Sequence, residues 1–359
     1  MISTSPFDRR HFLRYTGVAG LAAGGGLVLA ACGGGEASSS GSGTSEDGSK
    51  YGTVDVQLSW IKNIEFAGEY FAIEKGYYRD AGFSAVNLVA GGAAGTGVEA
   101  GLDTGKVWIG MSAPQLTAPA VLNGLPAKIV GATFQKNPFC IVSSAGKPIN
   151  TPQEMEGKRI GVQDSNQLVF GALLDANGID PSSISIVPAQ FDPSPLANGD
   201  VDGWVSYVTN EPIVLRAKGF ENHAMLFADF NLPLVAETFT VKQETIDNER
   251  DKLKAFLIAE IKGWRDAIAD PAESARLAAE VYGKDQNLDV AEQTEEAKAQ
   301  VGLVVSEDTK VNGLFTMTQR LVDENIAALK AAKLDIGASD LFDLSIIDEI
   351  YTEQPELKG

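Results

Sequence analysis

The sequence predicts an α/β protein made of two lobes. The chain has 359 residues, enough to form two lobes that each enclose a hydrophobic core. Short strand-like segments alternate with helix-like segments from residue 53 onward, and this alternation starts afresh after Ser144. We therefore expect residues 53–145 and 238–359 to form lobe I, and residues 146–237 to form lobe II.

The first 31 residues have the order of an export signal. Arg9, Arg10 and Arg14 precede an apolar, glycine-rich run that is poorly suited to span a membrane. The paired arginines followed by Phe-Leu resemble a twin-arginine signal, although Asp8 stands where Ser or Thr is usual. The Sec export route therefore remains an alternative.

The segment that follows resembles a lipid-attachment site. Leu29-Ala30-Ala31-Cys32-Gly33 is similar to a bacterial lipobox, which implies cleavage before Cys32 and lipidation of its thiol. The Gly- and Ser-rich residues 33–50 suit a flexible tether. We expect residues 32–52 to anchor the protein to the outer face of the cytoplasmic membrane. A chance cysteine after two alanines is the alternative.

The first strand and helix of lobe I place a polar turn where a ligand is expected. Residues 53–60 alternate apolar and polar side chains, and the apolar residues from 66 to 73 recur at helical spacing until Gly76. The turn between them follows the carboxyl end of the strand, where open α/β sheets bind ligands. It carries four candidate ligand contacts: Trp60, Asn63, Glu65 and Phe66.

Four more strands are expected in lobe I, at residues 84–90, 107–111, 127–134 and 139–143. The glycine-rich residues 91–97 form either a tight turn into a helix or a phosphate cradle, but they lack the Gly-Lys-Ser/Thr ending of a P-loop. Polar and aromatic residues at the strand ends add three candidate contacts: Ser112, Phe134 and Asn137.

Lobe II repeats this arrangement. Strands are expected at residues 157–162, 185–187 and 204–209, a helix at 167–176, and a strand at 235–241 that crosses back to lobe I. The candidate contacts here are Asp164, Asn166, Trp204, Tyr207, Asn210, Glu211 and Glu237. Helix capping alone would explain Asp164. Glu211 is the strongest candidate, and its alternative role is a carboxylate favoured by the helix dipole.

The remaining sequence is helical and is expected to pack onto lobe I. Its longest apolar face indicates a core helix rather than a binding surface, and comprises Leu253, Phe256, Leu257, Ile261, Trp264 and Ile268. Asp270-Pro271-Ala272-Glu273 is typical of the start of the next helix. Later helices are expected around residues 292–300, 312–332 and 346–351.

Composition limits the chemistry. The chain has a formal net charge of −19, which disfavours binding to nucleic acid and to anionic lipid. It has two histidines and two cysteines, of which only His223 and Cys140 fall in the folded body. A zinc or iron site made of His and Cys is therefore not expected, nor is a cofactor. No Gly-x-Ser-x-Gly elbow indicates serine catalysis.

Three motifs resemble one protein family. Trp60 and a polar turn precede Ala-Gly-x-Tyr-x-Ala-x-x-x-Gly-Tyr at residues 67–77, which resembles the start of ABC-importer solute-binding proteins for sulfonates, nitrate and thiamine pyrimidines. Residues 155–161 resemble the opening of that family's second lobe, and Asn210-Glu211-Pro212 is closer to its thiamine-pyrimidine binders. The resemblance implies a type II periplasmic-binding-protein fold whose two lobes close on a hinge over a small solute. It also implies an ABC permease and its ATPase as partners, for which a monomer suffices.

The candidate residues favour a flat, nitrogen-rich solute. Aromatic faces stack on such a ring while carboxylates accept hydrogen bonds from its amines. A sulfonate or nitrate would need basic groups, and only Lys62 and Lys136 lie near the candidates. We therefore expect a thiamine-precursor aminopyrimidine first and riboflavin second, with a sulfonate or nitrate as the alternative.

An enzyme is the alternative from another class. The resembled fold is shared with thiamine-pyrimidine synthases, which use iron and consume a histidine and pyridoxal phosphate. Those enzymes carry a cysteine-rich motif, whereas this chain offers only Asn137-Pro138-Phe139-Cys140. They also act inside the cell, while this chain begins with an export signal. We therefore expect a binding protein rather than an enzyme.

Overall fold

The computed structural model describes residues 48–92 and 97–358. The expected export signal, Cys32, most of the tether and part of the glycine-rich run lie outside these residues. Within them, no helix is both long enough and apolar enough to cross a membrane.

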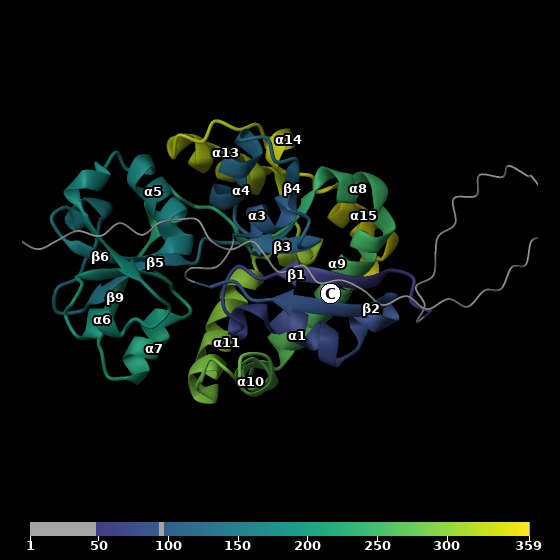
Figure 1. Ribbon diagram of the computed structural model, residues 1–359, viewed down its shortest axis with the longest axis horizontal. Helices are drawn as coiled ribbons and strands as arrows, with labels where there is room; N and C mark the ends of the chain where they lie inside the picture. The colour runs from purple at the N-terminus through teal and green to yellow at the C-terminus, as the bar shows by residue number, and fades with distance from the viewer. Residues whose placement is uncertain (1–47, 93–96, 359) are drawn as a thin grey trace, which may run out of the picture. The chain divides into compact units, whose positions relative to one another are not determined.

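Lobe I is formed around a mixed five-stranded sheet with strand order β2-β1-β3-β10-β4 (Figure 1). Its strands are β1 (Gly52–Gln57), β2 (Phe83–Val89), β3 (Ile109–Ser112), β4 (Ala127–Phe134) and β10 (Ala236–Lys242). β1 is parallel to β2 and β3, whereas β10 is antiparallel to β3 and β4. The carboxyl ends of β1, β2 and β3 therefore meet at one edge of the sheet.

Lobe II repeats this design, with strand order β7-β6-β8-β5-β9. Its strands are β5 (Phe139–Ser144), β6 (Arg159–Gln163), β7 (Ser185–Ala189), β8 (Gly203–Tyr207) and β9 (Asn222–Leu226). β6 is parallel to β7 and β8, and β5 is antiparallel to β8 and β9. The predicted α/β fold with two lobes agrees with this pair of sheets.

The lobe boundaries differ from those expected. β5 was expected in lobe I, but it pairs with β8 and β9, so the chain crosses to lobe II between Phe134 and Phe139 rather than after residue 145. β9 was not predicted because its side chains are mostly half-buried, which leaves no period-two pattern in the sequence.

The principal helices connect the strands as far as β10 and then follow one another toward the C-terminus. They are α1 (Ala67–Glu74), α3 (Val98–Asp103), α4 (Pro114–Leu122), α5 (Gln167–Ala176), α7 (Glu211–Ala217), α9 (Arg250–Ala269), α10 (Pro271–Arg276), α11 (Val290–Val304), α13 (Gln319–Ala331) and α15 (Ser345–Glu353). The shorter helices α2 (Tyr77–Asp80), α6 (Ser194–Ala197), α8 (Gln243–Asn248), α12 (Glu307–Asn312) and α14 (Ala338–Leu341) connect them.

The core of lobe I lies between its sheet and the packed pair α1 and α9. A Cβ atom on Gly68 of α1 would lie 2.1 Å from the indole of Trp264 on α9, so only glycine lets these helices approach this closely. The apolar face predicted for α9 is buried apart from the half-buried Ile268, and Asp270 caps α10 as expected by accepting a hydrogen bond from the Glu273 amide.

The C-terminal helices do not pack on lobe I alone. α13 contacts both α4 of lobe I and α5 of lobe II, and α11 contacts α7 of lobe II. Leu321 and Leu329 of α13 join one apolar cluster with Ile129 of β4 and Phe170 of α5. The hydrophobic core is therefore continuous from one lobe to the other on this side.

Candidate functional site

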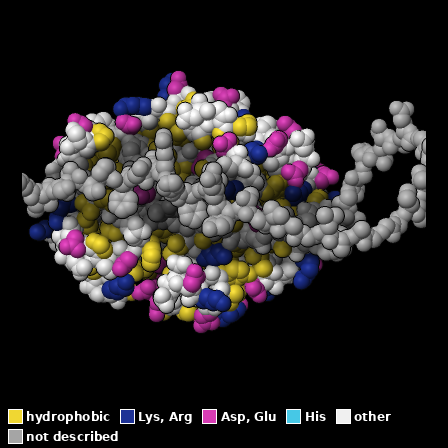
Figure 2. Space-filling view, in the orientation of Figure 1, with side chains coloured by type: hydrophobic (Ala, Val, Ile, Leu, Met, Phe, Trp, Pro, Cys, Tyr) yellow, Lys and Arg dark blue, Asp and Glu magenta, His cyan; other side chains and the backbone are white. Residues whose placement is uncertain are grey.

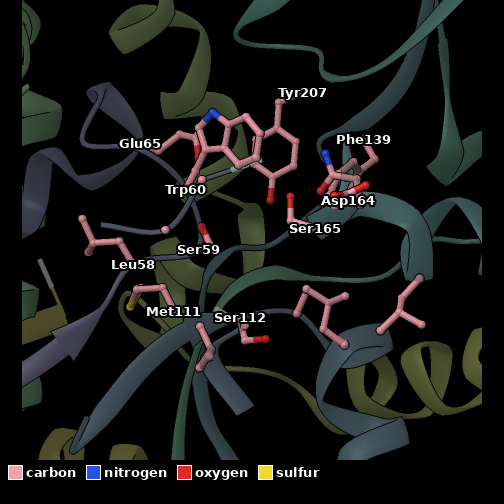
Figure 3. A pocket seen from close by; sticks show the side chains of 18 of the residues that line it. Leu58, Ser59, Trp60, Glu65, Met111, Ser112, Phe139, Asp164, Ser165 and Tyr207 are labelled. Carbon is pink, nitrogen blue, oxygen red and sulfur yellow. The ribbon is translucent and has the colours of Figure 1, made fainter. Parts of the chain in front are cut away.

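A pocket of about 320 Å³ lies between the two lobes (Figure 3). Lobe I supplies residues that follow β1, β2 and β3, and lobe II supplies residues that follow β6 and β8. The lining comprises Leu58, Ser59, Trp60, Glu65, Gly91, Gly92, Gly97, Val98, Glu99, Met111, Ser112, Ala113, Leu116, Phe139, Asp164, Ser165, Asn166, Leu168, Ser206, Tyr207, Asn210 and Glu211. The pocket thus occupies the strand ends at which the sequence placed it.

Glycine allows the β1 and β2 ends to meet beside the pocket. The Gly91 amide donates a 2.8 Å hydrogen bond to the carbonyl of Trp60. A Cβ atom at residue 91 would lie 2.7 Å from the carbonyl oxygens of Leu58 and Ser59. Gly91 is therefore needed for close backbone contact, which holds Trp60 at the pocket wall.

Glu65 is a buried carboxylate held by two asparagines. The Asn63 side chain accepts a 3.1 Å hydrogen bond from the Glu65 amide and donates a 3.0 Å bond to Glu65 Oε1. Asn210 of lobe II donates to the same oxygen. Burial, followed by repulsion from Glu237, raises the pKa of Glu65 to about 8. This carboxyl group therefore changes charge near neutral pH, and it connects the lobes through Asn210.

Glu211 is the first residue of α7 and also lines the pocket. Its Oε2 atom accepts hydrogen bonds from the Ser206 hydroxyl at 2.8 Å and from the Tyr207 amide at 3.2 Å. Among the described residues, no hydrogen bond reaches Oε1. Burial raises the pKa of Glu211 to about 7. The helix-dipole role and the ligand role are therefore compatible, because one oxygen is held by the protein and the other remains available.

Glu237 lies behind the pocket wall rather than on it. The Ser59 hydroxyl donates to both of its oxygens, at 2.9 and 2.8 Å, and the Tyr207 hydroxyl donates to Oε1 at 2.9 Å. Its backbone has φ of 47°, which is uncommon for glutamate. Burial raises its pKa to about 7. Glu237 therefore fixes two pocket side chains, one from each lobe.

A second acidic group lies at Ser112. The hydroxyls of Ser112 and Thr117 donate to Glu99 Oε1 at 2.6 and 2.8 Å. In Figure 3, Ser112 and Met111 lie across the pocket from Trp60, Glu65 and Tyr207. The pocket lining therefore carries acidic groups on two sides, one beside Ser112 and one at Glu65 (Figure 3).

The structure brings most of the sequence-predicted candidates to the pocket. Those that line it are Trp60, Glu65, Ser112, Asp164, Asn166, Tyr207, Asn210 and Glu211. Those that do not are Asn63, Phe66, Phe134, Asn137, Trp204 and Glu237. Asn63 and Glu237 instead hold lining residues in place.

The other four non-lining residues have structural roles. Phe66 and Phe134 are fully buried in the core of lobe I, and Trp204 packs on Gly161 in lobe II. Asn137 donates a 2.7 Å hydrogen bond to the Leu232 carbonyl and accepts one from the Phe139 amide at 2.9 Å. Proximity to a strand end predicted their position along the chain, but it did not predict which way each side chain points.

Sequence reasoning missed several lining residues. Glu99, Ser59 and Ser206 are polar examples, and Leu58, Met111, Leu116, Phe139, Ser165 and Leu168 complete much of the wall. Ser59 and Ser206 lie one position before predicted contacts, so a strand-end window two residues wider would have included them. Nothing in the sequence marks Glu99, because its hydroxyl partners are 13 and 18 residues away.

The described part of the chain offers no cluster of side chains suited to a metal ion. Within residues 48–92 and 97–358, no group of three or more His, Cys, Asp or Glu side chains is placed to hold a metal ion. Cys140 is free and buried, and burial raises the pKa of its thiol. The iron required by the synthase alternative therefore does not fit the described side chains.

Comparison with known proteins identifies related sequences. The family model described as NMT1/THI5 like matches residues 63–274, more than half of the chain. The chain is 27% identical over 307 residues to the riboflavin-binding protein RibY of Chloroflexus aurantiacus, covering 79% of this chain and 83% of that protein. It is 22% identical over 256 residues to the formylaminopyrimidine-binding protein of Halalkalibacterium halodurans, covering 70% and 74%.

A third relative is an enzyme. The 4-amino-5-hydroxymethyl-2-methylpyrimidine phosphate synthase of Schizosaccharomyces pombe is 25% identical over 218 residues, covering 57% of this chain and 62% of that protein.

Solved structures share the fold. The nitrate-binding protein NrtA of Synechocystis PCC 6803 aligns with a TM-score of 0.62 at 13% identity, covering 85% of this chain and 90% of that one. The alkanesulfonate-binding protein SsuA of Xanthomonas axonopodis pv. citri, bound to MOPS, aligns with a TM-score of 0.59 at 15% identity, covering 80% and 95%. The predicted periplasmic-binding-protein fold is confirmed.

Proposed function

Because the chain belongs to the NMT1/THI5-like family, we propose that it is the solute-binding protein of an ABC importer and that its solute is a neutral or cationic heteroaromatic compound. The observation that carries this proposal is the charge of the pocket. Every charged side chain in the described lining is acidic: Glu65, Glu99, Asp164 and Glu211. An anionic solute would find no basic side chain in the described lining.

The arrangement suits a flat ring with hydrogen-bond donors on its edge. Trp60 and Tyr207 offer aromatic faces for stacking. Glu211 Oε1 and Glu65 Oε2 receive no hydrogen bond from the described residues, so each is available to a ring N–H or an exocyclic amine. Sulfonate and nitrate are disfavoured, because the described lining contains no Lys, Arg or His.

The names of the relatives agree with such a ring. One is called riboflavin-binding and another formylaminopyrimidine-binding, and both words describe nitrogen heterocycles. We take an aminopyrimidine and riboflavin as the two candidate solutes.

Solute capture would use the connections between the lobes. The Asn137 side chain of one crossing segment donates to the Leu232 carbonyl of the other, which couples the two segments as a hinge. We further propose that residues 1–31 direct export, and that lipidated Cys32 and residues 33–52 tether the protein outside the membrane next to its permease.

The synthase remains the competing function, because one relative carries that name. Purification in the presence of ferrous iron distinguishes a synthase from a solute-binding protein. A binding protein retains no iron and leaves the solute chemically unchanged. Retention of one equivalent of iron, with conversion of added pyridoxal phosphate, would establish the enzyme.

The direct test is titration of purified residues 33–359 followed by native mass spectrometry. The ligands are 4-amino-5-hydroxymethyl-2-methylpyrimidine, riboflavin, taurine and an alkanesulfonate. We expect a one-to-one complex with a ring compound and none with the sulfonates. Binding of sulfonates alone would overturn the assignment of solute class.

A further inference from the structure

Glu99 lies apart from the ring contacts and has an arrangement of its own. Ser112 and Thr117 both donate to Oε1, which fixes the carboxylate plane. No hydrogen bond from the described residues reaches Oε2. The two hydroxyls therefore orient Glu99 as an acceptor whose second oxygen is free.

Gly97 leaves this oxygen accessible. A Cβ atom at residue 97 would have only one neighbour within 4 Å, Glu99 Oε2 at 3.8 Å. Gly97 and Glu99 both line the pocket, so Oε2 is next to a part of the wall that carries no side chain. A donor group on a solute can reach it from inside the pocket.

Ser112, which holds Glu99, lies across the pocket from Glu65 (Figure 3). Leu58, Met111, Leu116 and Phe139 contribute apolar surface, and Figure 3 shows Ser112 and Met111 on the far side from Trp60 and Glu65. The volume of about 320 Å³ lies within the range of pockets for drug-sized ligands, about 300–1,000 Å³.

We propose that Glu99, oriented by Ser112 and Thr117, is a second subsite that binds a hydroxyl- or amine-bearing arm of the solute. The inference rests on the proposed function and narrows it. The solute then has two parts: a heteroaromatic ring at Glu65 and Glu211, and a neutral or cationic arm with hydrogen-bond donors at Glu99. An arm that ends in phosphate or carboxylate is repelled by Glu99.

Three flavins that share one ring system test the subsite. Riboflavin carries a neutral arm with several hydroxyls, lumiflavin has a methyl group in place of the arm, and flavin mononucleotide ends the arm in phosphate. Dissociation constants are measured by quenching of flavin fluorescence at a single pH and ionic strength. We expect riboflavin to bind at least about tenfold more tightly than either of the others.

Three variants test whether the preference for riboflavin depends on Glu99. Glu99→Gln should reduce the preference for riboflavin over lumiflavin to less than about threefold, and continued binding of lumiflavin shows that the variant is folded. The double variant Ser112→Ala, Thr117→Val should lose the preference for riboflavin in the same way, although the charge of Glu99 is retained. Asp103→Asn, an exposed change on the same helix, should keep the wild-type preference.

The pyrimidine candidate is tested in the same way. 4-Amino-5-hydroxymethyl-2-methylpyrimidine is compared with its 5-methyl analogue, and Glu99→Gln should remove any preference for the hydroxyl. If wild-type protein binds each ligand and its armless analogue equally, the subsite is refuted while the proposed function stands. If no ring compound binds, both the proposed function and the subsite fail.

Discussion

Two groups of buried carboxylates, one at the pocket between the lobes and one inside lobe I, are treated differently by the fold. At the pocket, Glu65, Glu211 and Glu237 each accept hydrogen bonds from asparagine, serine or tyrosine groups. Between α1 and α9, Glu69 and Glu260 are fully buried, and both oxygens of Glu69 and Oε2 of Glu260 have no hydrogen-bond partner among the described residues.

The difference indicates two kinds of role. At Glu65 and Glu211 the hydrogen-bond donors of the described residues occupy one oxygen and leave the other available, which suits recognition of a solute, whereas both oxygens of Glu237 are bonded by the protein. Burial raises the pKa of Glu260 to about 8, and burial together with Glu260 raises that of Glu69 well above its usual value. The interior pair is therefore held in the protonated form near neutral pH, where it affects stability rather than binding.

The largest expected effect is on binding, from Glu211→Gln. The glutamine oxygen takes the bonds from Ser206 and the Tyr207 amide, which turns its NH₂ group toward the pocket. That group meets the donor edge of a heteroaromatic ring, so affinity should fall more than tenfold at pH 8, measured by titration calorimetry. Glu221→Gln, an exposed change in the same lobe, should leave affinity unaltered. Unchanged affinity in Glu211→Gln would mean that this carboxylate does not contact the solute.

The interior pair should affect stability with a defined pH dependence. Since the folded-state pKa of Glu260 is raised from 4.5 to about 8, its contribution to stability is fully present below pH 4.5 and is lost as pH rises toward 8. Glu260→Gln cannot ionise, still accepts the hydrogen bond from Tyr78, and places an NH₂ donor near Glu69.

We therefore expect Glu260→Gln to be more stable than wild type at pH 8 by about 1 kcal/mol or more, and similar at pH 4.5. Urea denaturation at both pH values measures this difference, and Asp251→Asn on the same helix is the exposed control. Solute affinity should not change. If Glu260→Gln were less stable than wild type at pH 8, the expectation would be wrong. The ionised Glu260 would then make an interaction that glutamine cannot make.

The sequence predicted regular elements well and side-chain direction less well. β4 (Ala127–Phe134) and α5 (Gln167–Ala176) have the expected bounds because each is a clear apolar pattern between polar breaks. β5 was assigned to the wrong lobe because a strand's sequence shows its burial but not its partner strands. Reasoning from single segments also could not foresee that α13 would contact both lobes.

The absence of long-range information in single segments also explains which site residues could be predicted. Glu65 and Glu211 follow strands β1 and β8 in the chain, so the strand-end rule predicted their place in the pocket lining. Trp204 lies at the start of β8 rather than at its carboxyl end, and there it packs on Gly161. Glu99 becomes recognisable only when Ser112 and Thr117 are brought beside it by folding.

The smallest effect is expected at Asp164, which lines the pocket but is exposed to solvent. Its Oδ1 atom accepts only a 3.3 Å hydrogen bond from Gln167, and water screens its charge. Asp164→Asn should therefore change solute affinity by less than about twofold, in contrast to the buried Glu211 in the same lobe. Calorimetric titration of both variants under identical conditions gives the comparison. If Asp164→Asn lowered solute affinity as much as Glu211→Gln, burial would not determine how much each carboxylate contributes to affinity. Asp164 would then contact the solute directly in the bound state.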